Sequence, residues 1–185
     1  MGEFLLVRHS ISKLDLSVPA ATWGLSAEGR EKCIGLAQEM AQHRPTAVFT
    51  SHEPKAVQTG QIVGEILGIP VETAVNLHEH DRSNVTNMSQ QTFKSNVARL
   101  FTDPDTHFFG TESGAEARQR FAQGVKSVLR ANPQEKAAII AHGTVITLFL
   151  AAHNPIDPIR FWQALKMPDL IVVEKETYQL VKRET

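Results

Sequence analysis

The strongest constraint on the fold is a set of short apolar runs, each followed by a segment long enough to form a helix. Residues 4–7 and residues 137–141 are uninterrupted apolar stretches. Runs of this length without alternating polar residues are typical of strands that are buried on both faces of a parallel sheet. The segments between the runs repeat apolar residues at helical spacing. This alternation predicts an α/β fold with a largely parallel central sheet.

The ends of several helices are marked by residues that favour helix termini. Ser26 and Ser113 each precede an amphipathic segment, and a serine hydroxyl can accept hydrogen bonds from the free N–H groups of a first helical turn. Glu116 completes a capping-box pattern with Ser113, and Gly68 favours a helix end. We expect further strands at 46–50, 69–72, 170–174 and 178–182, helices at 26–42, 89–101, 113–131 and 145–152, and two more helices, ending near residue 67 and beginning at residue 157.

The composition is that of one globular domain. The chain has 185 residues, of which 42% are hydrophobic and 21% are charged, and a single domain commonly has roughly 100–200 residues. We expect one domain over residues 1–185, in which the irregular part at 76–111 is an excursion off the sheet that shapes a pocket. Cys33 is the only cysteine, which excludes an intrachain disulfide and a thiolate zinc cluster.

The charge and hydropathy patterns argue against two classes of partner. Lys and Arg number 19 against 20 Asp and Glu, so the formal charge of −1 gives no reason to expect nucleic acid or an anionic membrane as partner. No apolar stretch approaches the ~18–20 residues of a membrane span, and the first apolar run is too short for a signal peptide. We therefore expect a cytoplasmic protein.

Polar residues that follow the strands are the candidates for chemistry. His9 and His142 each come directly after a buried strand, and Arg8 stands beside the first of them. Lys55 follows another strand and Glu79 lies near the end of a fourth. The carboxyl ends of parallel strands share one edge of a sheet, so these side chains can meet there. Cations beside neutral histidine suit a phosphate monoester, which carries about −1.5 to −2 charges at pH 7.

Five blocks of sequence, in order, carry a resemblance to a known family. They are Leu-Val-Arg-His-Ser at 6–10, Leu-Ser-Ala-Glu-Gly at 25–29, Thr-Ser-His-Glu-Pro-Lys-Ala-Val-Gln-Thr-Gly at 50–60, Leu-His-Glu at 77–79 and Ala-His-Gly-Thr-Val-Ile at 141–146. Together they resemble the histidine phosphatase superfamily, the phosphoglycerate mutase-like proteins, over about residues 3–150. The resemblance implies a three-layer α/β/α sandwich and neither a metal nor an organic cofactor.

The resemblance also implies a role for each matching residue. His9 would be the nucleophile that becomes phosphorylated. Arg8 and His142 would bind the phosphoryl group, and Lys55 stands where the family usually has a second arginine. Glu79 falls where the family often has its general acid. The chain departs from the family motif at Ser10, which replaces a glycine and whose hydroxyl could bind phosphate instead, and the family's polar residues shortly after the nucleophile are poorly matched at 11–13.

Two alternatives remain open at the site. Asp81 is the rival of Glu79 as the acid. His78 and His80, two residues apart beside these carboxylates, would suit a metal if they lay on a strand. Because the zinc-protease spacing is missing and cysteine cannot contribute, we expect no metal.

The leading prediction is a metal-independent phosphatase that hydrolyses a phosphomonoester through a phosphohistidine on His9. A mutase of the phosphoglycerate mutase type is the nearest alternative, because it uses the same intermediate. A non-catalytic phosphate-binding or interaction module is the alternative from another class, and Ser10 and Lys55 are the residues that favour it. The expected partner is a small phosphorylated substrate or a phosphoprotein, and the oligomeric state is left open.

Overall fold

The computed structural model describes residues 2–85 and 88–184. Its elements, in chain order, are β1 Glu3–Arg8, the 3-10 helix η1 Ala20–Thr22, α1 Ala27–His43, β2 Ala47–Thr50, α2 Pro54–Leu67, β3 Val71–Thr73, α3 Gln90–Thr102, α4 Gly114–Ala131, β4 Ala137–Ala141, α5 Gly143–Ala151, α6 Pro158–Ala164, β5 Asp169–Glu174 and β6 Leu180–Glu184. The strands form one sheet in the order β3-β2-β4-β1-β5-β6. The first four are parallel, whereas β5 and β6 run antiparallel to their neighbours.

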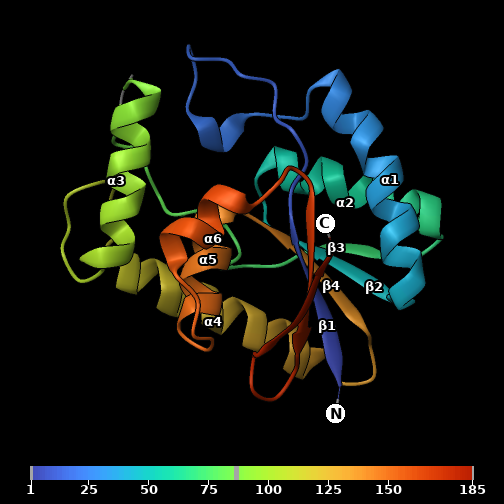
Figure 1. The fold of residues 1–185 in the computed structure, drawn as a ribbon. Coiled ribbons are helices and arrows are strands. Elements are labelled where there is room, and N and C mark those ends of the chain that lie inside the picture. Colours follow the sequence, from blue (N-terminus) through green and yellow to red (C-terminus); the bar gives the residue numbers. More distant parts are fainter. Residues whose placement is uncertain (1, 86–87, 185) are drawn as a thin grey trace.

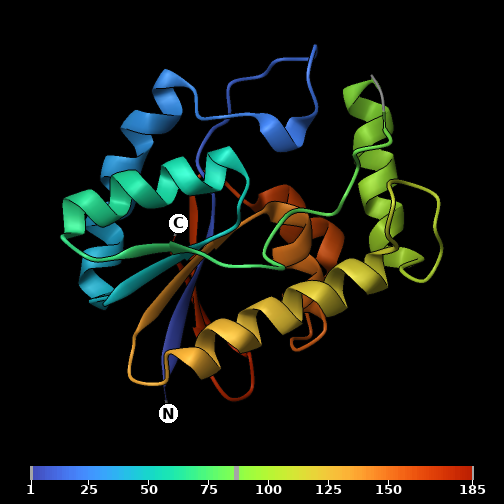
Figure 2. The same cartoon turned by 180° about the vertical axis from the view of Figure 1, so that it is seen from behind.

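Helices cover both faces of the sheet, as Figure 1 shows, and Figure 2 gives the reverse view. Side chains of successive strand residues point to opposite faces, and β1 follows this rule. Phe4 and Leu6 belong to a core with α4 and α5, whereas Leu5 and Val7 belong to a core with α1 and α2. The three-layer α/β/α sandwich with a largely parallel sheet is therefore confirmed.

Most expected elements are present. Their observed ends show which of the predicted start and end signals are used. Ser26 accepts a hydrogen bond from the Gly29 N–H, and the capping box of Ser113 and Glu116 is formed. The helix expected from residue 145 begins at Gly143 instead, directly after His142. The last strand lies at Leu180–Glu184 and not at 178–182, because Tyr178 adopts a left-handed conformation with φ 60° in the turn before it.

The excursion contains one helix of its own. α3 begins with Ser89 as N-cap and buries Val97 and Leu100. These two residues form a small separate core with Phe109, against which Phe93 and Trp162 pack. Residues 86 and 87 of the segment predicted as an excursion lie outside the described residues.

In the described part of the chain, no helix is both long and apolar enough to cross a bilayer.

Candidate active site

The register of the sheet brings the two strand-end histidines together. Arg8 is paired with Ala141 across β1 and β4, and the His9 N–H donates to the Ala141 carbonyl at 3.0 Å. His142 follows Ala141 directly, and the centroids of the two imidazole rings lie 5.1 Å apart. The side chains expected at one edge of the sheet from their positions after two strands are therefore neighbours.

The hydrogen bond of His9 decides which ring nitrogen can react. Nδ1 lies 2.6 Å from the carbonyl oxygen of Ser10. A carbonyl can only accept, so Nδ1 carries the hydrogen and the lone pair of the neutral ring lies on Nε2. Burial, followed by His142 and Lys55, holds the pKa of His9 well below its usual range. A neutral imidazole with a free Nε2 is a competent nucleophile at neutral pH.

His142 lies at the N-terminus of α5, where it is the N-cap residue without a side-chain cap bond. It is fully buried, and neither ring nitrogen has a hydrogen-bond partner among the described residues. Burial lowers the pKa of His142, and Lys55 and Arg82 lower it further, against the opposing effect of Glu79. Buried polar atoms without a partner are uncommon in folded proteins, so they mark this ring as a candidate ligand-binding group.

Arg8 is held by backbone from a different part of the chain. Its NH1 donates to the Leu165 carbonyl at 2.9 Å, whereas its Nε has no partner among the described residues. Gly143 lies so close that a Cβ built on it would be 3.1 Å from Nε. The absence of a side chain at Gly143 therefore leaves the room that the guanidinium occupies.

Lys55 is buried and ion-paired, which its sequence did not indicate. Its Nζ donates to Glu53 Oε2 at 2.5 Å and to the Ala20 carbonyl at 2.8 Å. Glu53 is also buried, and its Oε1 accepts from the Glu79 N–H at 2.7 Å and lies 3.4 Å from His142 Nε2. We call Arg8, His9, Glu53, Lys55 and His142 the strand-end cluster.

Glu79 is bound directly at the N-terminus of α5. Its Oε2 accepts from the Thr144 N–H at 3.1 Å and its Oε1 from the Val145 N–H at 3.2 Å. These are free N–H groups of the first helical turn, which favour a negative charge. Burial alone would raise the pKa of Glu79, but Arg82, His142 and backbone N–H groups outweigh it and hold the pKa well below its usual range. Glu79 is therefore a carboxylate near neutral pH.

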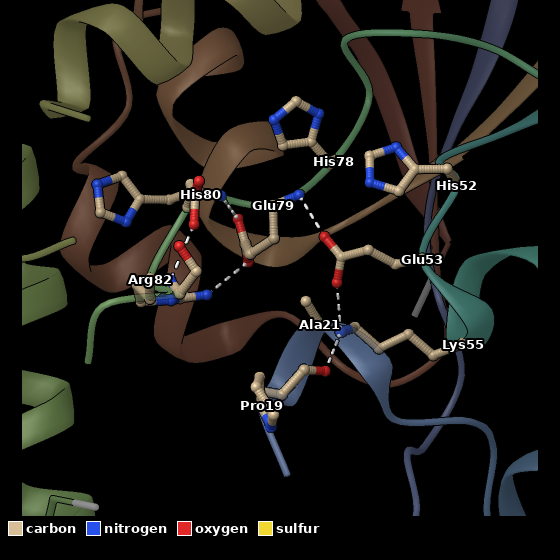
Figure 3. Close-up of a pocket in the computed structure, with 12 residues that line it drawn as sticks. Pro19, Ala21, His52, Glu53, Lys55, His78, Glu79, His80 and Arg82 are labelled. Carbon is tan, nitrogen blue, oxygen red and sulfur yellow. Dashed lines mark hydrogen bonds and ion pairs between the residues drawn. The ribbon is translucent and has the colours of Figure 1, made fainter. Parts of the chain in front are cut away.

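A cavity of about 290 Å³ opens beside these residues (Figure 3). Its lining consists of Pro19, Ala20, Ala21, His52, Glu53, Lys55 and residues 78–83. We call residues 78–83 the outer wall. In the outer wall, Arg82 NH2 lies 3.5 Å from Glu79 Oε2. The Arg82 guanidinium also lies over the rings of Phe93 and Phe109, at 5.1 and 5.7 Å from their centroids. Residues 78–83 thus supply this side of the cavity, and Phe93 and Phe109 pack against it.

Arg120 of α4 ties the start of the outer wall in place. Its NH1 donates to the carbonyls of Asn76 and His78, and its NH2 to the carbonyl of Glu79. Its Nε and the second N–H of NH2 donate to the Glu112 carboxylate. All five guanidinium N–H donors are thus used, and Glu79 is fixed through its backbone as well as its carboxylate.

Ser10 and Asp81 lie differently from the other candidates. Ser10 is fully buried, and its hydroxyl donates to the Gly29 carbonyl at 2.7 Å. Its phosphate-binding role stays a prediction. Asp81 lines the cavity, and its carboxylate accepts from the Ser83 N–H at 2.8 Å.

The histidines of the outer wall are not arranged as a metal site. His80 Nε2 donates to the Glu112 carbonyl at 2.8 Å, so this ring points into the protein. His78 lies beside His52, with ring centroids 5.1 Å apart. Across residues 2–85 and 88–184, no three His, Cys, Asp or Glu side chains are grouped so that they could hold a metal ion.

Sequence reasoning missed Glu53 and the pair of Arg120 and Glu112. Glu53 stands two residues before Lys55 in the segment that follows β2, so the opposite charges are close in the sequence, but the sequence alone does not show that both are buried. Arg120 is three residues from Ala117 and next to Phe121, so it borders the apolar face of α4. That position predicts partial burial but not the carbonyls that it meets.

Comparisons with known proteins show which family the chain resembles. The family model described as histidine phosphatase superfamily (branch 1) matches residues 4–179. The uncharacterized phosphatase PhoE of Bacillus subtilis (strain 168) is 25% identical over 163 residues, which cover 85% of this chain and 80% of that protein.

Solved structures show the same fold at low identity. Phosphoserine phosphatase from Entamoeba histolytica, in complex with 3-phosphoglyceric acid, gives a TM-score of 0.79 at 15% identity, and the match covers 100% of this chain and 98% of that one. A mycobacterial glucosyl-3-phosphoglycerate phosphatase gives 0.76 at 16% identity with the same coverage. With the family model spanning nearly the whole sequence, the chain belongs to the histidine phosphatase superfamily.

Proposed function

We propose that this chain is a metal-independent phosphatase that hydrolyses a small phosphomonoester through a phosphohistidine on His9. The observation that carries the proposal is the hydrogen bond from His9 Nδ1 to the Ser10 carbonyl, which leaves the Nε2 lone pair free beside His142. Membership of the superfamily and the phosphatase relative support the same activity.

In the first step, His9 Nε2 attacks phosphorus and the bond between phosphorus and the ester oxygen breaks. The leaving oxygen takes the electron pair of that bond together with a proton. In the second step, a water oxygen attacks phosphorus, the bond between phosphorus and Nε2 breaks, and its electron pair returns to the ring. The products are the alcohol and inorganic phosphate.

Three groups of the strand-end cluster would hold the phosphoryl oxygens. Arg8 has an Nε without a partner among the described residues, and His142 has two such ring nitrogens. The Lys55 ammonium has three N–H groups, of which two are engaged by Glu53 and Ala20. Donors that are already fixed before the reaction stabilise developing charge without further reorganisation, which is the main source of rate in phosphoryl transfer.

Glu79 would carry the proton, although it is ionised in the structure described. A phosphomonoester has a second pKa of about 6, so a fraction of the substrate molecules binds as the monoanion, which still carries a proton. A phosphoryl group next to Glu79 adds negative charge and raises the pKa of that carboxyl, which lets it accept this proton and pass it to the leaving oxygen. In the second step the carboxylate takes the proton of the attacking water.

We expect a small substrate, and we expect neither nucleic acid nor a membrane as a partner of the protein. The cavity of about 290 Å³ has room for a small molecule beside Lys55 and Glu79. The structural relatives are named for phosphoserine and for a glucosylated phosphoglycerate, both of them small phosphomonoesters. We expect this activity in the cytoplasm, from one domain over residues 1–185 in which residues 76–111 shape the pocket.

The test is phosphate release from nitrophenyl phosphate, phosphoglycerates, phosphoserine, sugar phosphates and phosphopeptides, with and without a chelator. The proposal predicts chelator-insensitive release that falls at least about a thousandfold in His9→Ala, because the nucleophile is lost. Isomerisation of a phosphoglycerate faster than phosphate release would establish a mutase instead. Phosphate binding without turnover on any substrate would establish a non-catalytic module.

A further inference from the structure

Glu53 places a buried carboxylate inside a site built for an anion. Only 4% of the residue is exposed. As the N-cap residue of α2 it could bond the free N–H groups of the first turn, but its side chain makes no cap bond. The carboxylate turns instead toward the cavity, as Figure 3 shows, where it joins Lys55 to the Glu79 backbone. A negative charge at this place needs an explanation, because it opposes the binding of phosphate.

The contacts of Glu53 reach three elements of the site. One oxygen, Oε2, accepts from Lys55 on α2. The other, Oε1, accepts from the Glu79 N–H after β3 and lies 3.4 Å from His142 at the start of α5. A single carboxylate therefore fixes the distances between a proposed phosphate-binding cation and the proposed proton carrier.

Lys55 needs such a partner more than an arginine would. A lysine side chain ends in a point charge on a flexible stem, whereas the guanidinium of arginine is a rigid fork that can hold two phosphate oxygens at once. Glu53 and the Ala20 carbonyl together engage two of the three ammonium N–H groups and so fix the direction of the third.

We propose that Glu53 is a positioning residue, which orients Lys55 toward the phosphoryl group and holds the Glu79 segment beside it. The inference rests on the proposed phosphoryl transfer at His9. It assigns a role to a residue that contacts neither phosphorus nor the leaving oxygen and acts through Lys55. The competing interpretation is that Glu53 is simply an anion that competes with the substrate for Lys55.

Two substitutions of Glu53 separate the interpretations. Glu53→Gln keeps the shape and removes the charge, whereas Glu53→Asp keeps the charge and shortens the reach by one methylene. If Glu53 positions Lys55, both variants bind inorganic phosphate about tenfold more weakly, the size expected for one misdirected charged hydrogen bond. If Glu53 only competes, Glu53→Gln binds phosphate more tightly and Glu53→Asp binds it as the wild type does.

A double-mutant cycle shows whether the effect passes through Lys55. With Lys55→Met already in place, Glu53→Gln is expected to weaken phosphate binding no further. Lys55→Arg in the Glu53→Gln background is expected to restore binding to within about threefold of the wild type, because the fork needs less orientation. Equal losses with and without Lys55, or no rescue by arginine, would contradict the proposal.

The experiment is calorimetry with inorganic phosphate, followed by kcat and KM for the best phosphomonoester. Glu184→Gln is the matched control, because this carboxylate pairs with His43 and Lys182 and is not part of the cavity lining. Melting temperatures check that each variant is folded. Phosphate binding requires no turnover, so a wild type that binds phosphate without hydrolysis refutes the proposed function alone. A wild type that does not bind phosphate overturns the role of Glu53 as well.

Discussion

The strand-end cluster meets the outer wall at one cavity through Glu53 and Lys55, but the two regions are held in different ways. Three of the five cluster residues are at the end of a strand or directly after one, where sheet register sets the backbone, as it does for Arg8 against Ala141. The outer wall follows the edge strand β3 and is fixed by side chains from distant parts of the chain. Arg120 binds the backbone at its start, and Phe93 and Phe109 lie against Arg82.

This difference separates two tasks. A phosphoryl group has the same shape in every phosphomonoester, so the groups that bind it benefit from a rigid frame. The remainder of the substrate differs from one phosphomonoester to the next, and loops on a fixed scaffold can change without disturbing the sheet. We therefore expect changes in the strand-end cluster to affect all substrates alike, and changes in the outer wall to affect them unequally.

Among the tests of this comparison, the largest expected effect concerns the outer wall. Arg120→Leu removes the donors to three carbonyls and leaves the Glu112 carboxylate without its cation, so Glu79 loses its fixed position. We expect kcat to fall about 10- to 100-fold for alkyl phosphates and much less for nitrophenyl phosphate, whose leaving group scarcely needs a proton. Inorganic phosphate should bind within about threefold of the wild type.

Arg118→Leu is the matched control for Arg120→Leu. Arg118 is exposed on the same helix, two residues earlier. Arg118→Leu should leave kcat unchanged for both alkyl phosphates and nitrophenyl phosphate. If Arg120→Leu reduced the turnover of both substrates equally, the separate roles assigned to the strand-end cluster and the outer wall would be wrong.

A second prediction tests the strand-end cluster. In Gly143→Ala the new Cβ would lie about 3.1 Å from Arg8 Nε and about 3.2 Å from its Cζ, so the guanidinium must shift. We expect kcat/KM to fall about tenfold for every substrate, which corresponds to about 1.4 kcal/mol of transition-state stabilisation. The measurement is kcat/KM for alkyl and nitrophenyl phosphates side by side.

Gly35→Ala provides the comparison for this substitution. Gly35 lies in α1, and a Cβ there would meet no atom within 4 Å. Alanine should stabilise the helix by about 0.5–1 kcal/mol without changing kcat/KM. A Gly143→Ala enzyme as active as Gly35→Ala would show that the position of Arg8 is not critical.

The smallest expected effect concerns stability against pH. Burial holds the pKa values of His9 and His142 well below the usual 6.5 in the folded protein. Below the unfolded pKa the unfolded chain binds these protons and the folded chain does not, so stability is lost as the pH falls. Each histidine contributes at most about 1.4 kcal/mol per pH unit.

Urea unfolding between pH 5 and pH 6.5 measures this slope, which we expect to be smaller in His9→Asn than in the wild type. A slope that does not change in His9→Asn would mean that His9 is protonated in the folded protein, and its assignment as a neutral nucleophile would then be wrong.

The sequence predicted the strand-end cluster better than the outer wall, and the physical reason is the range of the interactions. His9 and His142 follow apolar runs that had to be strands, and parallel strands bring their carboxyl ends together. Predicting the contacts of Arg120 requires knowing where α4 passes the segment after β3, and no local sequence pattern contains that information. Glu53 was overlooked for a different reason, because an N-cap carboxylate is usually solvated and this one is buried with Lys55.

Phosphorylation of His9 underlies every step of the proposed reaction, and trapping the phosphoenzyme tests it. The protein is mixed with a turned-over phosphomonoester, quenched in alkaline denaturant and digested, and the peptides are analysed by mass spectrometry. We expect one phosphoryl group on the peptide that contains His9, with acid-labile attachment, and none in His9→Ala. Steady phosphate release with no phosphoryl group on His9, or with the group on another residue, would contradict it.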